Sequence, residues 1–320
     1  MTAVGGLHHV TAIAGDAQRN VNFYAGVLGL RLVKRTVNFD DPTTYHLYYG
    51  DELGTPGSLM TFFPWPAAHR GRQGVNQIAI TSFAVLPNTF GFWIERFLRY
   101  GVAYEGPLRS ALGSERILRF KDPDGLILQL VGDPAAERRN GWDGASGIPP
   151  DNAIRGLHGV TLWLEETGPT ERLLSEALGF RAVSEDEGTR RFAIPNAPVG
   201  GIVDLRAVGG FLRGSEGPGT VHHVALAVRN ASEQLAVRAN VIAAGLHPTE
   251  IIDRRYFQSV YFREPAGVLF EVATEAPGFT VDEPAERLGE ELMLPAQYQA
   301  LRIQLETTLP PIEIPHQISR

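Results

Sequence analysis

The stretch that decides the fold runs from Val221 to Val228 and reads VHHVALAV. It is an apolar segment of strand length with two histidines near its start, and strands rarely bury such groups without a partner. A second apolar segment, Val268–Val272, encloses one carboxylate, that of Glu271. A buried carboxylate is costly unless it is neutralised or lies against a cation. The two segments therefore predict a buried polar site.

The first predicted strand of the chain repeats the histidine pair. Residues 7–13 read LHHVTAI, so His8 and His9 stand where His222 and His223 stand in the later strand. Side chains alternate between the two faces of a strand, so only one histidine of each pair faces the same side as Glu271. One histidine from each pair and one carboxylate are the ligand set of a divalent metal site with open positions.

The strand that carries each pair belongs to a unit that recurs four times. Each unit has an apolar strand, an amphipathic helix that stops at a glycine, and about three more strands. The units begin near Leu7, Val75, Leu157 and Val221, and their helices are predicted near residues 16–28, 88–100, 170–178 and 232–244. One such unit cannot close a core alone, so we expect an α+β fold of four βαβββ modules paired into two curved mixed β-sheet domains.

The linker between the two halves is predicted at residues 136–155, which are rich in Pro, Gly and charged residues. Such composition is typical of a boundary between domains. We therefore expect an N-terminal domain at 1–135, a C-terminal domain at 156–276 and a C-terminal extension at 277–320. Each domain is expected to contain two modules.

Alignment of the modules indicates how many metal sites to expect. The second histidine of each pair, His9 or His223, is replaced in modules two and three by Gln77 and Gly159. At the position of Glu271 the other modules have Gln129, Thr61, and either Asp204 or Leu205. Only modules one and four keep strong metal ligands, so one site between them is the simplest reading.

Composition limits the class of protein. The chain has 320 residues, of which 43% are hydrophobic and 20% charged, as in ordinary globular proteins. The absence of cysteine excludes disulfides and thiolate chemistry, and the net charge of −7 argues against a nucleic-acid partner. The N-terminus lacks the pattern of a signal peptide, and no apolar run reaches membrane-spanning length. We therefore expect a cytoplasmic protein without a membrane partner.

The four-module array resembles the vicinal oxygen chelate superfamily, which includes glyoxalases, bleomycin-resistance proteins and extradiol dioxygenases. Within it, the two His-His motifs, Phe270–Val272, and the tail motifs Leu294–Tyr298 and Leu309–Pro311 look like the hydroquinone ring-cleaving dioxygenases. In that subgroup the ligands come from the first and last modules, whereas in catechol extradiol enzymes the second half supplies all three. The resemblance implies His9, His223 and Glu271 as ligands of Fe(II), although Mn(II) suits the same donors.

The resemblance also implies the reaction and further site residues. The expected reaction is cleavage of a small aromatic diol by an Fe(II)-dependent dioxygenase with O2 as co-substrate. Ring cleavage needs an acid or base and a cation near the reacting oxygen, and Arg254 and Tyr261 are the implied candidates. Thr11, which shares a strand face with His9, is implied beside the ligands, as are His8 and His222. Strand parity instead turns His8 and His222 toward the sheet or a neighbouring pocket wall.

Other readings of single residues remain open at this stage. Either histidine of a pair can be the ligand, Arg254 can pair with Asp253 or Glu250 at the surface, and Tyr261 can be ordinary strand packing. His46 and the acidic pair Asp40–Asp41 are assigned no role.

Two further classes of function are also open. One is another metal enzyme on this scaffold, such as an isomerase or a thiol transferase, and the other is a metal-free resistance protein that binds aromatic drugs. An isomerase site calls for a second carboxylate beside the metal, which Gln77, Gln129 and Thr61 do not supply. A drug-binding protein has no need of the two histidines and the glutamate together. A homo-oligomer is also possible, because the C-terminal extension is long enough to lie across a neighbouring copy.

Overall fold

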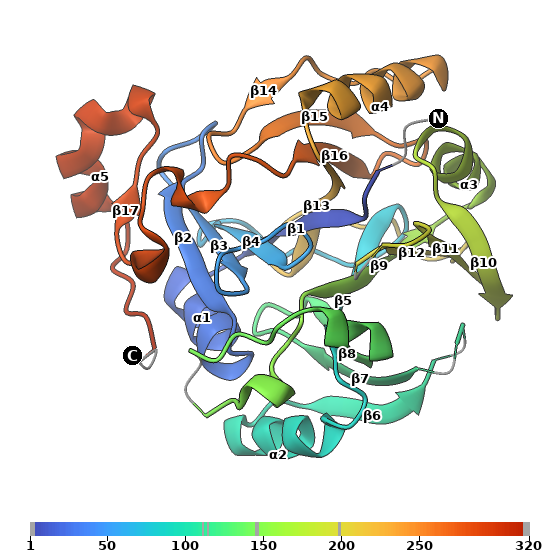
Figure 1. The fold of residues 1–320 in the computed structure, drawn as a ribbon, viewed down its shortest axis with the longest axis horizontal. Coiled ribbons are helices and arrows are strands. Elements are labelled where there is room, and N and C mark those ends of the chain that lie inside the picture. The colour runs from blue at the N-terminus through green and yellow to red at the C-terminus, as the bar shows by residue number, and fades with distance from the viewer. Residues whose placement is uncertain (1–3, 111, 114, 145–146, 198–199, 316–320) are drawn as a thin grey trace.

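The computed structural model describes residues 4–110, 112–113, 115–144, 147–197 and 200–315. In this part of the chain the strands form two mixed sheets, one of nine strands and one of eight, with short helices on their outer sides (Figure 1). The predicted α+β class and the four βαβββ modules are confirmed.

The modules follow one another in the predicted order. Module one has β1 (Leu7–Ala14), α1 (Ala17–Val21) continued by a π-helical segment (Asn22–Val27), β2 (Arg31–Val37), β3 (Tyr45–Gly50) and β4 (Leu59–Pro64). Module two has β5 (Gln77–Val85), α2 (Phe90–Tyr100), β6 (Tyr104–Arg109), β7 (Arg116–Lys121) and β8 (Ile127–Gly132). Short 3-10 helices at Pro134–Arg138 and Pro150–Asn152 lie in the segment that follows.

The second half repeats this plan. Module three has β9 (Leu157–Leu164), α3 (Gly168–Arg172) continued by a π-helical segment (Leu173–Ala177), β10 (Arg181–Asp186), β11 (Thr189–Ala193) and β12 (Ile202–Ala207). Module four has β13 (Thr220–Val228), α4 (Ala231–Ala243), β14 (Ile252–Asp253), β15 (Gln258–Arg263) and β16 (Leu269–Thr274). The C-terminal extension adds 3-10 helices (Phe279–Val281, Ala285–Arg287, Ala296–Leu301), β17 (Leu292–Met293) and α5 (Arg302–Thr308).

Local sequence explains where the helices begin and how they are held. Asp16 caps α1, because its carboxylate accepts a hydrogen bond of 2.7 Å from the backbone N–H of Arg19. The turn between β7 and β8 then fixes this helix from the other sheet: Asp122 accepts hydrogen bonds from the N–H groups of Asp124 and Leu126 and from the hydroxyl of Tyr24. In the corresponding turn of module four, Glu264 accepts hydrogen bonds from the N–H of Val268 and from the hydroxyl of Thr170 in α3.

The modules pair across the two halves of the chain. The first sheet has the order β14-β15-β16-β13-β1-β4-β3-β2-β17 and the second β10-β11-β12-β9-β5-β8-β7-β6. Modules one and four therefore share one sheet, and modules two and three share the other. The sheets do not follow the expected division into residues 1–135 and 156–276, since each takes strands from both sides of the 136–155 segment. The domain boundaries themselves stay a prediction.

The register between β1 and β13 creates a local two-fold symmetry. The strands are antiparallel, with His9 opposite Ala225 and Thr11 opposite His223, so His9 and His223 are symmetry counterparts. On the outer sides, β4 places Thr61 beside Thr11 and β16 places Glu271 beside Ala225. Thr61 is therefore the counterpart of Glu271.

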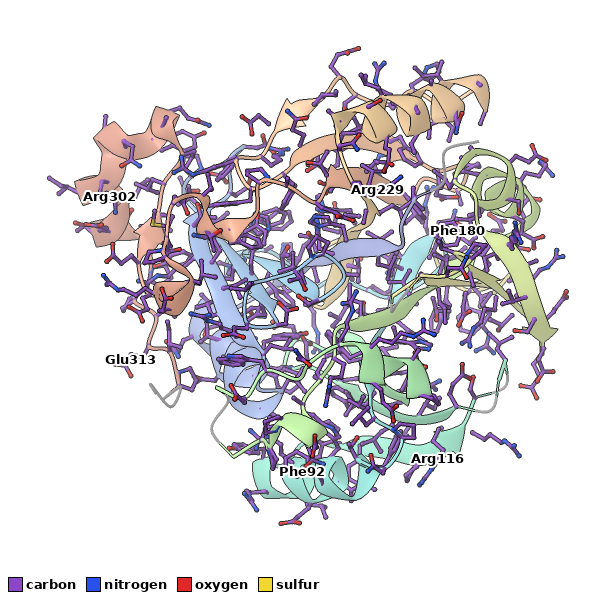
Figure 2. All side chains as sticks on the ribbon, in the orientation of Figure 1. Phe92, Arg116, Phe180, Arg229, Arg302 and Glu313 are labelled. Carbon is purple, nitrogen blue, oxygen red and sulfur yellow. The ribbon has the colours of Figure 1, made fainter. Side chains whose placement is uncertain are left out.

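The C-terminal extension covers the outer edge of the first sheet. Its strand β17 pairs with β2, and Figure 2 shows Arg302 of the following helix at the rim of the molecule. A buried lysine, Lys34 on β2, anchors the segment, because its ammonium lies 2.7 Å from Asp282 and also contacts Glu283. Phe279 packs edge-on against Tyr48 of β3. The extension thus supports the strands that carry the site.

Candidate metal centre

Three predicted ligands converge between β1, β13 and β16. The Nε2 atoms of His9 and His223 are 3.2 Å apart, and they lie 3.2 and 3.0 Å from Oε2 of Glu271. All three side chains are buried, and their donor atoms lie within 4.8 Å of one another. In the part of the chain that the structure describes, these three side chains lie close enough together to share a metal ion.

The two oxygens of the Glu271 carboxylate differ in their hydrogen bonds, and this difference bears on whether the site fits a divalent cation. Glu271 has no exposed surface, and its Oε1 accepts a hydrogen bond of 2.5 Å from the hydroxyl of Ser259. Oε2 makes no hydrogen bond of acceptable geometry, despite the two nearby imidazoles. A buried carboxylate oxygen without a hydrogen-bond donor is unfavourable, and a cation between it and the two nitrogens removes that cost. The residues therefore fit a metal ion.

The neighbouring histidines orient these imidazoles. Nδ1 of His8 lies 2.8 Å from Nδ1 of His9, and Nδ1 of His222 lies 2.7 Å from Nδ1 of His223. Burial, followed by the nearby charge of His9, lowers the pKa of His8 to about 3, so this ring is a neutral hydrogen-bond acceptor. Each inner ring can then donate from Nδ1 and keep its Nε2 lone pair for a metal. Burial also lowers the pKa of His223 to about 4, which favours the neutral form that binds metals.

A cavity of about 420 Å³ opens in front of these three side chains. Its wall is largely aromatic and includes Phe39, Phe63, Trp65 and Phe257, which suits a flat ring. His222 lines this wall and meets Phe63 and Trp65 edge-on, whereas His8 packs against Phe257. His222 therefore lies in the wall of the same cavity as His223, although strand parity had turned it away from the ligand face.

The pair Arg254 and Tyr261 lines the same cavity. Arg254 donates from Nε to the Tyr261 hydroxyl at 3.3 Å. Burial and the Glu271 charge raise the pKa of Tyr261, so its hydroxyl keeps its proton at neutral pH. The pKa of Arg254 is raised: burial acts against this, but hydrogen bonds to Asp40 and Tyr261 outweigh it. The wall therefore presents a permanent cation and a protonated hydroxyl.

The partner of Arg254 differs from both surface partners considered from the sequence. Its guanidinium binds both oxygens of Asp40, at 3.1 and 3.0 Å, whereas Glu250 pairs with Arg238. Asp40 is exposed, as its reading as solvated surface expected, but it also reaches across from module one to pair with Arg254 and lines the cavity, which the sequence did not indicate. Sequence separation of 214 residues hides this contact from any local pattern.

Thr11 lies behind the cavity, in a chain of hydrogen bonds. Its hydroxyl is 2.8 Å from that of Thr61, which is 2.9 Å from Nε2 of His46. Nδ1 of His46 lies 2.8 Å from the Tyr48 hydroxyl. Both His46 and Tyr48 line the cavity, so the sequence reasoning missed two residues of this wall. Burial first, and then the charges of His9 and His223, lower the pKa of His46, which keeps its ring neutral.

The second sheet shows what has replaced the ligands there. Its central pair aligns Ile80 with Thr161 and Ser82 with Gly159, so Ile80 and Gly159 hold the positions of His9 and His223. The alignment of Gln77 with His9 was therefore wrong by three residues. The register also selects Asp204 rather than Leu205 as the counterpart of Glu271. Asp204 is bound by Arg191 at 2.8 and 3.0 Å, which neutralises it.

Comparison with known proteins follows this geometry. A family model described as "Glyoxalase/Bleomycin resistance protein/Dioxygenase superfamily" matches residues 6–130. A Bacillus subtilis protein, "Putative ring-cleaving dioxygenase MhqO", is 42% identical over 97% of this chain and 97% of its own length. The chain belongs to this superfamily.

Two other relatives extend the comparison. A Sphingobium indicum protein named "Chlorohydroquinone/hydroquinone 1,2-dioxygenase" is 33% identical over 96% of each chain. A crystal structure described as "putative dioxygenase from Bacillus subtilis" matches with a TM-score of 0.91 at 40% identity. The match covers 99% of this chain and 100% of the other. The fold and the superfamily are thus shown by relatives that span nearly the whole chain.

Across the described residues, no helix combines the length and apolar character needed to cross a bilayer.

Proposed function

We propose that this protein is an Fe(II)-dependent ring-cleaving dioxygenase that acts on a hydroquinone-type aromatic diol and inserts both atoms of O2. The observation that carries the proposal is the buried group His9, His223 and Glu271 at the base of an aromatic cavity. The names of the full-length relatives support the reaction class, and one of them names hydroquinone as a substrate.

The residues have separate tasks in this proposal. His9, His223 and Glu271 would hold the metal, which when bound would acidify a substrate hydroxyl and bring the ring and O2 together. Tyr261 can donate its proton to a developing oxyanion, and the Arg254 charge stabilises that anion. The aromatic wall holds the ring and excludes water. Mn(II) suits the same donors, so metal analysis must determine which of the two ions the protein holds.

The structure gives reasons to prefer this function over the alternatives. An isomerase of the glyoxalase type needs a second carboxylate, but the symmetry position of Glu271 holds Thr61, whose hydroxyl is bonded to Thr11 and His46. A metal-free binding protein gains nothing from a buried carboxylate oxygen that lacks a hydrogen-bond donor. Location in the cytoplasm and the oligomeric state stay predictions.

The test combines metal analysis with oxygen uptake. Protein purified without oxygen should retain about one iron per chain, and it should consume O2 on addition of hydroquinone with both ¹⁸O atoms recovered in the product. His9→Ala, His223→Ala and Glu271→Ala should each lose metal and uptake. His158→Ala is the matched control, because His158 is a buried histidine on the equivalent strand β9 of the other sheet.

Each outcome separates two classes of function. Uptake with catechol and none with hydroquinone would move the enzyme to another ring-cleaving specificity. Full metal content and turnover in any one of the three ligand variants would contradict the assignment. A purified protein that binds neither iron nor manganese and consumes no O2 would leave the metal-free binding protein as the better explanation.

A further inference from the structure

Strand β3 presents a second tyrosine, Tyr48, to the cavity. Tyr48 lies on the module-one wall, and Tyr261 lies on the module-four wall. On β15, Tyr261 lies opposite Glu271 of β16, and on β3, Tyr48 lies opposite Thr61 of β4. Since Thr61 is the counterpart of Glu271, Tyr48 is the counterpart of Tyr261. Both tyrosines line the cavity. The cavity therefore has one phenol on the side of the glutamate and another on the side of the threonine.

The two tyrosines differ in what holds them. Tyr261 receives a hydrogen bond from Arg254, which can only donate. The Tyr48 hydroxyl is hydrogen-bonded to His46 at 2.8 Å. This hydrogen-bond chain continues from His46 to Thr61 at 2.9 Å and from Thr61 to Thr11 at 2.8 Å. Hydroxyls and a neutral imidazole can each donate or accept, so this chain can run in either direction. Tyr48 can therefore offer a ligand either a proton or a lone pair.

A diol with its hydroxyls at opposite ends of the ring needs two polar partners when the ring lies between apolar walls. The metal centre provides a partner for one oxygen. The other oxygen lies across the ring, and burying it without a hydrogen bond is unfavourable. In a diol with adjacent hydroxyls, both oxygens lie at the same end and no partner is needed across the ring. A hydrogen-bonding group away from the metal centre thus favours the 1,4 arrangement.

We propose that Tyr48, oriented by His46, binds the ring hydroxyl that lies away from the metal centre and so selects a 1,4-diol over a ring with one hydroxyl. This inference rests on the proposed function and adds the residue that recognises the second oxygen. The phenol ring is fixed for this task, because it packs edge-on against Phe279 and Tyr256. Its hydroxyl keeps its place through the bond to His46.

The experiment compares hydroquinone with phenol, which lacks only the second hydroxyl. Dissociation constants for both are measured by calorimetry on the iron-loaded protein without oxygen, and steady-state kcat and KM for hydroquinone are measured separately. In the wild type we expect hydroquinone to bind about 3- to 10-fold more tightly than phenol, as a neutral hydrogen bond supports. Tyr48→Phe should reduce this ratio to about one, with phenol binding unchanged. His46→Leu should reduce it in the same direction.

The matched control is Tyr45→Phe. Tyr45 is on the same strand, and its hydroxyl bonds to the carbonyl of Pro310 instead of facing the cavity, so the binding ratio should keep its wild-type value. An unchanged ratio in Tyr48→Phe, in a protein whose wild type binds and cleaves hydroquinone, would overturn this inference and leave the proposed function intact. A wild type that binds iron but neither binds nor cleaves hydroquinone would overturn the proposed function itself.

Discussion

Ser259→Ala should remove the support of the central carboxylate. The Ser259 hydroxyl donates to Oε1 of Glu271 at 2.5 Å, and neither side chain is exposed. Oε2 already lacks a hydrogen-bond donor, so the variant leaves the whole carboxylate without one in the metal-free protein. A hydrogen bond to a charged group contributes about 1.5–3 kcal/mol, and we expect a loss of that size in the free energy of unfolding. Loss of a group that orients a ligand should also weaken metal binding about 10- to 100-fold.

The measurements are urea unfolding of the metal-free protein and metal affinity by competition with a chelator. Ser82→Ala is the matched control, because Ser82 is a buried strand serine of the other sheet whose hydroxyl lies 3.2 Å from the neutral amide of Gln129. A neutral hydrogen bond contributes only about 0.5–1.5 kcal/mol, and this variant should keep its metal affinity. Equal destabilisation in the two variants, with wild-type metal affinity in both, would refute the reasoning.

Two further predictions concern stability. Burial raises the pKa of Asp122 to about 6 from 3.8, so its contribution to stability is complete below the unfolded pKa and is lost as pH rises through the folded one. Asp122→Asn keeps the two backbone hydrogen bonds. Relative to wild type, its free energy of unfolding should rise by about 2.4 kcal/mol between pH 4 and pH 7 in urea titrations, and a difference that does not vary with pH would contradict this. Phe279→Ala should cost about 3–5 kcal/mol by urea unfolding, because Phe279 is 3% exposed and packs against Tyr48 and Tyr256; Val281→Ala, an exposed neighbour, is the control and should change little.

The three proposed ligands were found from sequence because two signals agreed. A histidine pair in an apolar strand is ambiguous alone, but it recurs at matched positions of two modules, and Glu271 interrupts a strand that is otherwise apolar. Side-chain alternation then placed His9 and Thr11 on one face, as the structure has them. The strands and helices of the modules were predictable for the same reason, since their periodicity is local.

The remaining features depend on contacts that no local pattern encodes. Sheet edges alone do not determine the module pairing, because any two modules present similar edges. Only the ligand positions indicated that modules one and four meet, and the expected domain division grouped the modules differently. In β5 both faces are buried, so the run from Ile78 to Val85 has no polar residue at every second position to fix its register against β1. Asp40 of module one pairs with Arg254 of module four, and His46 of module one lines the cavity that the two modules share. Tyr48 alone among these residues had a signal in the sequence: it lies in the strand before the last strand of its module, as Tyr261 does in module four.

The two-fold symmetry explains why one sheet can hold a metal and how its cavity became one-sided. His9 and His223 are equivalent positions beside the axis between β1 and β13, so a histidine in both modules brings two imidazoles together without any special loop. The outer positions have diverged: Glu271 supplies a charge on one side, and Thr61 on the other side supplies only a hydroxyl. A second carboxylate at Thr61 would fill the metal's coordination from both sides and place a negative charge beside His46. With threonine there, the module-one wall is free to bind an uncharged ring hydroxyl, which is the task that we assign to Tyr48.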